Sequence, residues 1–450
     1  MVGGGSNMKE PLWLAEELVT KLKPRYDDVA ALVINDDTAM VKLWNTEPSV
    51  VQSWMRTRVG LLLAKNRRLL TLEISARKPE DVLKATERIE EIADKVEESE
   101  LYAPLPEPEG VKALTGMFDG RVVEALNNPR PYAEAMIDSA LSQGVDRVAG
   151  TLTLSRVVRA LATSKGFSGM EEKTYVEAYL RAFKGEFSGH WAHGSTRLDI
   201  NALKDVGLKA GQYATITNKK VDFQPGKYSV ILSPLVVGNL LGDVAFMASA
   251  TAVLLGYSMF MKYRLGDVVA SEKLSMYDVP HDTSLPRASA FDDEGSPTYD
   301  KPIIENGVLK NLLHNSGTAA KMGVKTTGNA GWIFARAWNL NIGLGDFKED
   351  ELISELRNGL IITNNWYTRL QNYVEGIFST VSRDATLLVK DGEILGDVGR
   401  VRIASKFSTL MKNIVGISNK PYDIMWWEVR TPTRCGYILA KDINITKPYI

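Results

Sequence analysis

The chain has 450 residues, with 54 Lys and Arg residues against 55 Asp and Glu residues and a formal net charge of −1. This length exceeds the roughly 250–300 residues at which a single hydrophobic core stops growing, so we expect two domains. The balanced charges form no basic stripe that could neutralise phosphates, which argues against nucleic-acid binding. A single cysteine cannot form an internal disulfide and favours a reducing, cytoplasmic location.

Apolar residues in the first half of the chain recur with helical spacing in some segments and alternate as in strands in others. Pro24 ends the first helical pattern, and Asn35-Asp36-Asp37 is interpreted as a turn between two strands. The proline-rich stretch Pro104 to Gly110 predicts a subdomain break near 100–110. The expected helices are 10–23, 78–97, 131–141 and 200–210, and the expected strands are 29–34, 40–44, 54–64, 69–74, 145–152, 157–163 and 174–183. These elements predict a mixed α/β domain over 8–222, which follows a flexible leader, MVGGGSN, at residues 1–7.

A boundary at 222–226, which contains Pro225, separates this domain from a second one over 223–450. Tyr228 to Ser233 alternates like a strand, and Pro234 then suits the first turn of a helix. From Val244 to Met261 the chain has 18 residues without a formal charge, which is the length at which a membrane span must be considered. Because this run is rich in Ala, Ser, Thr and Gly, we expect a buried helix of a soluble domain and no membrane association.

Two further turns in the second domain predict β-hairpins. Asn306-Gly307 and Asp391-Gly392 each separate two short apolar segments. Both dipeptides favour two-residue hairpin turns because their residues tolerate positive φ. The second domain is therefore expected to be rich in strands, and the whole chain is expected to be of the α+β class.

The helix that begins at Pro234 carries two strongly polar side chains in its first turns, Asn239 and Asp243. Their spacing of four residues places them on one face of the helix. Zinc peptidases with the pattern H-E-x-x-H use this geometry to place two His ligands on one metal ion. Neither position is His here, so the sequence has the helix of a metallopeptidase without its usual ligands.

Four motifs resemble the TldD/PmbA metallopeptidase family over most of the chain and in the same order. They are SPLVVGNLLGD (233–243), FDDEGSPT (291–298), IIENGVLKNLLHNSGTAAKMGVKTTGNAG (303–331) and RCGYILAKDINIT (434–446). The resemblance implies a β-rich, barrel-like C-terminal domain around a central buried helix.

The resemblance also implies where the site of the catalytic TldD branch would fall in this chain. In that branch the helix reads H-E-x-x-x-H and a distant Cys completes the zinc site. The first His then corresponds to Gly238, the Glu base to Asn239, the second His to Asp243 and the Cys to Cys435. Loss of three of the four residues is typical of the PmbA branch, also called TldE.

The remaining candidate residues have ordinary structural explanations beside the functional ones. Asp243 and Cys435 supply at most two acceptable zinc ligands, and the amide of Asn239 cannot act as a base near neutral pH. A lone Cys in a strand is usually a small buried hydrophobic residue. A charged triplet is usually a solvated loop, yet by resemblance it could shape the wall of a peptide groove, as could glycines that let a backbone approach closely. These possible groove residues are Asp292, Asp293, Glu294, Gly295, Gly328, Asn329 and Gly331.

The four histidines are weaker candidates than this set. His190 and His193 have no third ligand nearby in sequence, which favours a surface loop or a strand edge. His281 and His314 are isolated.

Taken together, the sequence predicts a subunit that resembles the non-catalytic member of a TldD/TldE-type complex. No cofactor is expected in this chain, and zinc is expected in a TldD-like catalytic partner that cleaves peptides or unfolded substrates. One alternative is an active metallopeptidase in which Asp243, Cys435 and a third ligand hold a metal ion. Another is a homodimeric peptide-binding or scaffolding protein.

Overall fold

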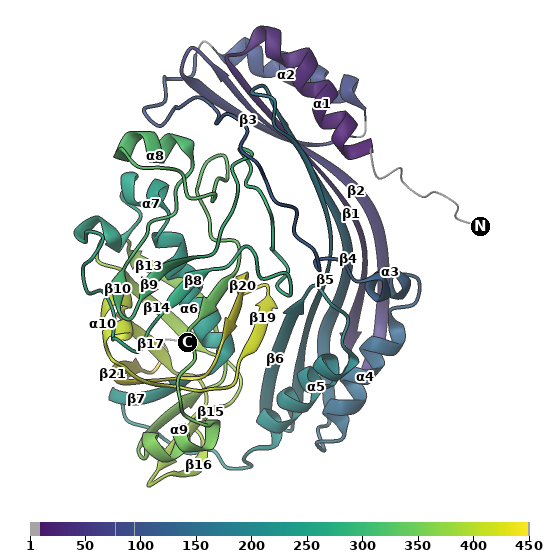
Figure 1. Cartoon of the computed structure of the whole chain (residues 1–450). Coiled ribbons are helices and arrows are strands. Elements are labelled where there is room, and N and C mark those ends of the chain that lie inside the picture. The colour runs from purple at the N-terminus through teal and green to yellow at the C-terminus, as the bar shows by residue number, and fades with distance from the viewer. Residues whose placement is uncertain (1–9, 77, 94, 449–450) are drawn as a thin grey trace.

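The computed structural model describes residues 10–76, 78–93 and 95–448, and it shows an α+β chain with three sheets (Figure 1). The leader predicted at residues 1–7 lies outside the described residues. The long first sheet curves along one side of the molecule, and its concave side faces the second half of the chain (Figure 1). Helices α1 (Glu10–Leu22) and α2 (Pro79–Ala93) lie at one end of this sheet, and α3 (Gly120–Ala125), α4 (Arg130–Leu141) and α5 (Ile200–Thr215) lie at the other (Figure 1).

The first sheet is antiparallel, with the order β3-β2-β1-β4-β5-β6. Its strands are β1 (Asp28–Trp44), β2 (Glu47–Lys65), β3 (Arg68–Ser75), β4 (Arg147–Thr163), β5 (Ser168–Lys184) and β6 (Phe187–Ser195). The prediction of two strands around Asn35-Asp36-Asp37 is wrong, because β1 runs through this triplet and pairs with β2 and β4 on its two sides. Arg56 and Arg58 on β2 form ion pairs with the buried Asp36, which stabilises a turn-type residue inside the strand.

The same correction applies to β4, which is continuous where two strands, 145–152 and 157–163, were predicted. Ser155 interrupts the apolar pattern, but its hydroxyl is hydrogen-bonded to that of Thr38 on β1. Strand β6 was not predicted. It places His190 and His193 on the edge strand of the sheet, with His190 buried.

The second half of the chain forms two further curled sheets, and the α+β, barrel-like fold class is confirmed (Figure 1). Both predicted hairpins are confirmed, at Asn306-Gly307 and at Asp391-Gly392. One sheet has the order β10-β9-β8-β11-β20-β19, from β8 (Met276–Asp278), β9 (Lys301–Glu305), β10 (Val308–Leu309), β11 (Leu340–Ile342), β19 (Tyr422–Trp426) and β20 (Val429–Cys435). The other has the order β13-β14-β17-β21-β7-β12-β15-β16, with β18 on β21, from β7 (Gly226–Leu232), β12 (Gly359–Ile362), β13 (Asn365–Asn372), β14 (Ile377–Ser382), β15 (Thr386–Lys390), β16 (Glu393–Asp397), β17 (Arg402–Lys406), β18 (Ile414–Ile417) and β21 (Ile438–Thr446).

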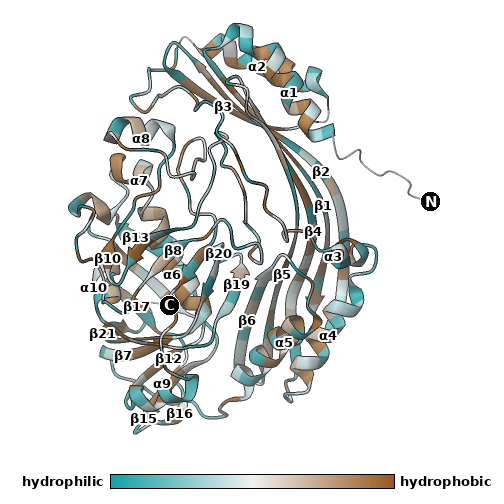
Figure 2. Ribbon diagram, viewed as in Figure 1, coloured by the Kyte–Doolittle hydropathy of each residue, from teal (hydrophilic) through white to brown (hydrophobic). Residues whose placement is uncertain are grey.

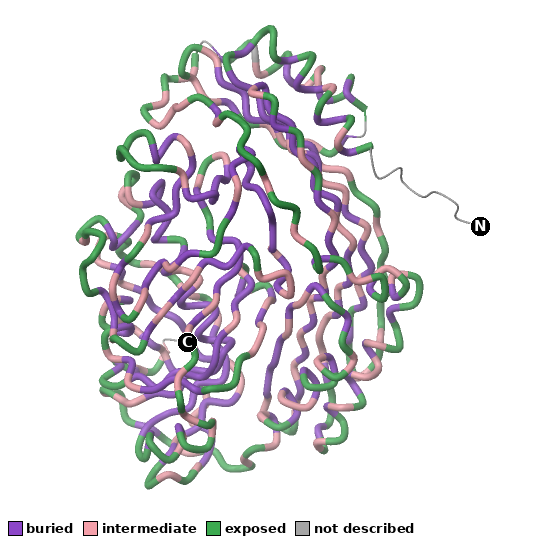
Figure 3. Tube along the Cα trace, in the orientation of Figure 1, coloured by how far each residue is buried: buried purple, intermediate pink, exposed green. Residues whose placement is uncertain are grey.

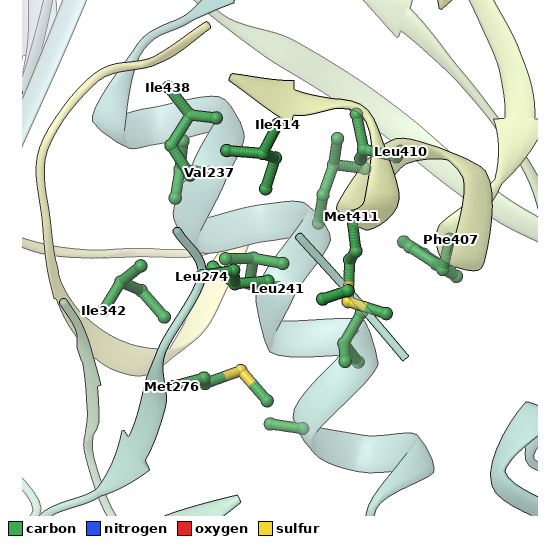
Figure 4. Close-up of a cluster of buried hydrophobic side chains, with 14 of the residues drawn as sticks. Val237, Leu241, Leu274, Met276, Ile342, Phe407, Leu410, Met411, Ile414 and Ile438 are labelled. Carbon is green, nitrogen blue, oxygen red and sulfur yellow. The ribbon is translucent and has the colours of Figure 1, made fainter. Parts of the chain in front are cut away.

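Helix α6 (Pro234–Met247) is the central buried helix of this half. Its apolar residues pack with side chains from both C-terminal sheets, and Figure 4 shows Val237 and Leu241 in this cluster. The helix ends at Met247, and the uncharged run continues as the separate short helix α7 (Ala250–Leu254), where Ala250 N–H donates to the carbonyl of Leu313. Among the residues that the structure describes, no helix is long and apolar enough to cross a membrane. The other helices are α8 (Ser316–Met322), α9 (Glu349–Leu356), α10 (Phe407–Lys412), η1 (Lys23–Arg25) and η2 (Met259–Lys262).

The two halves of the chain share part of their core. One cluster of buried residues joins α4 and α5 with strands of the first sheet and of both C-terminal sheets. Figure 2 shows apolar residues along these elements, and Figure 3 shows that the buried segments run through both halves. The boundary at 222–223 stays a prediction, since the contact between the halves is itself a packed interior.

Candidate functional site

Strand β20 packs along α6 in the opposite direction, so the beginning of the helix lies beside the end of the strand. The thiol of Cys435, at the end of β20, is 3.5 Å from the carbonyl oxygen of Pro234 in the first turn of α6. One turn later, a Cβ added at Gly238 would lie 2.9 Å from Cγ1 of Val429. A side chain at position 238 would therefore displace Val429, and α6 packs against β20 because this position is Gly.

Asn239 is the centre of a hydrogen-bond network that joins α6 to the loop before β20 and to β13. Its Nδ2 donates to the carbonyl of Glu428 at 2.8 Å. Its Oδ1 accepts from Asn365 Nδ2 and from Thr368 Oγ1, each at 2.7 Å. Only 8% of the residue is exposed, so the network satisfies polar atoms that would otherwise be buried without partners. The amide thus has a structural role at the position of the family's base.

Asp243 lies one turn further along α6, where the helix reaches the surface. Burial, and then the negative charge of Glu428, raise the pKa of Asp243 to about 7, although Arg430 opposes this shift. Glu428 is itself partly buried and its pKa is also raised by burial. Because the negative charge of Glu428 disfavours ionisation of Asp243, one of the two carboxyl groups readily binds a proton near neutral pH.

Cys435 is fully buried in the apolar core around α6. Burial, followed by the charge of Asp423, raises the pKa of its thiol well above the ordinary value, so the thiol stays protonated and weakly nucleophilic. The apolar environment agrees with the interpretation of a lone strand cysteine as a small hydrophobic residue.

The structure separates the two residues that were considered as remaining metal ligands. Cys435 lies beside Pro234 and Asp243 follows nine residues later, which at 1.5 Å per residue corresponds to about 13 Å along the helix axis. Within the described ranges, no three His, Cys, Asp or Glu side chains are arranged to hold a metal ion. The residues present therefore do not fit the zinc site of the catalytic branch.

The acidic loop at 292–294 is buried, not solvated. Asp292 accepts backbone hydrogen bonds from Glu294 and Ser296 through Oδ1 and from Ala330 through Oδ2, at 2.9–3.0 Å. Glu294 Oε2 accepts from the backbone N–H of Ser316 at 2.9 Å. Burial raises the pKa of both carboxyl groups, and the charge of Asp293 adds to the shift of Asp292 while that of Asp292 adds to the shift of Glu294. The loop is therefore part of the interior. The expectation of a solvated loop is wrong here because backbone N–H donors surround the carboxylates.

Asp293 connects the two halves of the chain through a buried ion pair with Arg159. Its carboxylate lies 2.8 Å from Arg159 on β4 and 2.8 Å from Arg336. Burial opposes ionisation, but the charges of Arg336 and Arg159 outweigh it and hold the pKa of Asp293 below its usual value. Arg159 also lies 3.3 Å from Glu171 on β5. Sequence analysis missed Arg159 and Glu171, because a charged residue in a long strand gives no sign that it is buried.

The glycines of the possible groove allow close packing at this junction. Gly295 has φ +87°, and a Cβ there would lie 2.6 Å from the ring of Phe167 on the turn between β4 and β5. Gly328 has φ +66° and lies against the carbonyl of Pro297. The Nδ2 of Asn329 donates to Asp278 at 2.6 Å and to the carbonyl of Arg336 at 2.9 Å. Gly295, Gly328 and Asn329 hold loops together in the interior, whereas Gly331 and Asp293 line a pocket of about 550 Å³ between the first sheet and residues 331–336.

The histidines do not form a site with one another. His190 packs on the ring of Trp426 with centroids 4.4 Å apart, and burial lowers its pKa to about 3. His281 Nε2 is 3.1 Å from Thr298 Oγ1, and His314 Nδ1 is 3.3 Å from Thr318 Oγ1. These three rings have local structural contacts, which agrees with the weak signal in the sequence.

Exposed aromatic and arginine side chains surround the surface end of α6. Trp427, beside Glu428, is 52% exposed, and Phe246, one turn after Asp243, is 41% exposed. Tyr367 is 56% exposed, lies under the guanidinium of Arg369 and provides a backbone hydrogen bond to Glu428. Rigid aromatic and arginine side chains of this kind are enriched where proteins bind peptides or other proteins.

Comparison with known proteins gives consistent matches. The model of the PmbA/TldA metallopeptidase C-terminal domain matches residues 225–447, and that of the central domain matches residues 78–217. The chain is 26% identical over 303 residues to a metalloprotease of Methanothermobacter thermautotrophicus, with 64% of this chain and 66% of that protein covered. It is 29% identical over 226 residues to metalloprotease PmbA of Escherichia coli O157:H7, with 49% and 47% covered.

The curated relatives are thus matched over about half to two thirds of their length. The solved structure of TldE from Thermococcus kodakarensis is similar over 96% of this chain and 100% of that one, with a TM-score of 0.82 and 20% identity, which shows a shared fold. Because two models of one family match in chain order and together include most of the residues, the chain belongs to the TldD/PmbA metallopeptidase family.

Proposed function

We propose that this chain is a non-catalytic subunit of the PmbA (TldE) kind in a zinc metallopeptidase complex. Its catalytic partner would be a TldD-like protein with the H-E-x-x-x-H motif and the zinc ion. The observation that carries the proposal is that packing interactions occupy the positions of the zinc site, since a side chain at Gly238 would displace Val429 and both amide atoms of Asn239 are hydrogen-bonded.

The role proposed for the subunit is to complete the substrate chamber and to hold a peptide or unfolded segment. The exposed Trp427, Tyr367 and Phe246 around the end of α6 support this role, because they offer apolar contacts to a chain without a fixed fold. The single cysteine supports a cytoplasmic location for the complex.

The test compares the isolated chain with the same chain co-expressed with a TldD-like protein. We expect the pair to elute as a mixed assembly with one zinc ion per catalytic subunit and to hydrolyse unfolded peptides. The isolated chain should contain no zinc and should not hydrolyse peptides. Changing the Glu of the partner's H-E-x-x-x-H to Gln should abolish hydrolysis. The matched change here, Cys435→Ala, should leave it intact.

Stoichiometric zinc and peptide hydrolysis in the isolated chain would show an active metallopeptidase with an atypical site. A homodimer that excludes the TldD-like protein would instead favour the stand-alone binding or scaffolding role. Size-exclusion chromatography and elemental analysis distinguish these outcomes from the proposed complex.

A further inference from the structure

A cavity of about 390 Å³ lies between α5, α9 and the sheet that contains β7, β12 and β15, and none of its lining residues belongs to α6 or β20. Its floor consists of three side chains that are neighbours across adjacent strands. Ile361 on β12 pairs in register with Ile231 on β7 and with Leu387 on β15. A continuous aliphatic row in a cavity of this size is typical of sites for small ligands, which have volumes of about 300–1,000 Å³.

One side of the cavity is polar. Tyr213 on α5 and Tyr437 both line it, and their hydroxyl groups are 2.5 Å apart. Each hydroxyl has one proton, and their mutual hydrogen bond uses only one of the two. The pair therefore keeps one O–H that can donate to a ligand.

Lys209, one turn before Tyr213 on α5, provides a positive charge at the same side. Its ammonium is 3.9 Å from Glu349 Oε2, which is too long for a hydrogen bond, and the other oxygen of Glu349 accepts the hydroxyl proton of Tyr422. No hydrogen bond joins the ammonium to another of the described residues, although it lies 4.9 Å from the ring centre of Trp191 and 4.7 Å from that of Tyr422. The ammonium thus has an ion-pair partner but no hydrogen bond among the described residues, and it can donate hydrogen bonds to an anionic group.

We propose that this cavity binds a medium-chain aliphatic monocarboxylate. The alkyl chain lies along the row of Ile231, Ile361 and Leu387, and the carboxylate accepts hydrogen bonds from Lys209 and from the free hydroxyl proton of the tyrosine pair. This inference is independent of the proposed complex, because it uses none of the residues around α6.

The test is titration of the full chain with decanoate below its micelle concentration, followed by calorimetry and by tryptophan fluorescence, which reports on Trp191 beside Lys209. Saturable binding of one equivalent is expected. Lys209→Met keeps the length of the side chain and removes the charge, and it should weaken binding at least tenfold. The matched control Lys204→Met, at an exposed position of the same helix, should leave binding unchanged.

A second variant, Ile353→Trp, fills the cavity from the partly exposed side of α9 and should abolish binding. Thermal unfolding of each variant establishes that it is folded. Decanol should bind at least tenfold more weakly than decanoate, because it cannot pair with the ammonium. Absence of saturable decanoate binding, or equal affinities of the native chain and Lys209→Met, would overturn the proposal, and so would equal affinities for decanoate and decanol.

Discussion

Asn239 stabilises the fold through three hydrogen bonds made by one small side chain. Replacing Asn239 with Ala removes one hydrogen-bond partner each from the carbonyl of Glu428, from Nδ2 of Asn365 and from Oγ1 of Thr368. We therefore expect Asn239→Ala to lower the free energy of unfolding by about 1–3 kcal/mol, as measured by urea denaturation. Asn201→Ala, at an exposed position early in α5, is the control and should change stability by less than about 0.5 kcal/mol. An equally small effect at Asn239 would mean that water replaces the network.

Asp243 should make stability depend on pH. A carboxyl whose pKa is raised to about 7 in the folded chain binds its proton more tightly there than in the unfolded chain. Its contribution is therefore fully present below about pH 4 and is lost as the pH rises to about 7, by at most about 4 kcal/mol.

The measurement compares urea unfolding of the native chain and Asp243→Asn between pH 4 and pH 8. The stability of the variant relative to the native chain should increase over this range, because Asn cannot ionise. The difference between the two proteins cancels the contributions of Asp292 and Glu294, whose pKa values are also raised. Parallel pH profiles would contradict the assignment.

Substitution of Gly295 tests how tightly its turn packs against Phe167. Gly295 and Gly144 both have positive φ, at +87° and +75°, but only Gly295 has a neighbour, the Phe167 ring, within 4 Å of an added Cβ. Gly144→Ala should cost about 1–2 kcal/mol of stability from backbone strain alone. Gly295→Ala should cost clearly more in the same urea experiment, because Phe167 must also move. Equal losses would show that the Phe167 ring rearranges freely.

Elements whose structure depends on neighbouring residues could be predicted from the sequence. Elements stabilised by residues far away in the sequence could not. The helix α1 has a regular apolar stripe, and the Asp391-Gly392 turn has a local preference for positive φ, so both could be predicted from a few residues. Strand β1 could not, because Asp36 looks like a turn residue until the arginines of β2 are placed beside it. The length of α6 was overestimated for a similar reason, since its end at Met247 depends on the hydrogen bond from Ala250 to Leu313.

The same limit applies to the candidate site. The placement of Asn239 and Asp243 on one face of the helix followed from spacing, and the correspondence of Gly238, Asn239, Asp243 and Cys435 with a zinc site followed from the family resemblance. The hydrogen bonds of Asn239 to β13 did not follow, because Asn365 is 126 residues away in the sequence. Nor could the sequence show that the acidic loop is buried, since the arginines that neutralise Asp293 come from β4 and from the segment before β11.

At the scale of the whole molecule, the Glu171-Arg159-Asp293 cluster connects the first sheet to the C-terminal half. Removal of the central cation takes the guanidinium from the buried Glu171 and leaves Asp293 with Arg336, the more exposed of its two partners. Arg159→Met should therefore lower the free energy of unfolding by about 3–5 kcal/mol. The control Arg156→Met, on the same strand in a more exposed pair with Glu172, should cost no more than about 1 kcal/mol.

Urea unfolding followed by tryptophan fluorescence provides the comparison between these two variants. If Arg159→Met and Arg156→Met were equally stable, the junction would depend on apolar packing and not on the ion pairs. A single unfolding transition in the native chain would in addition show that the two halves unfold together, as their shared core suggests.

The register of β1 has a consequence for the time at which the chain can fold in the cell. Ala31 pairs with Ala162, so one side of β1 has no partner until the ribosome has added more than a hundred further residues. At 5–20 residues per second this wait lasts on the order of ten seconds. During synthesis, the hairpin of β1 and β2 therefore emerges with one unpaired edge, although α1, which is made before it, can already cover part of its apolar face. We therefore expect this edge of the nascent chain to be able to pair with other strands until β4 has been synthesised.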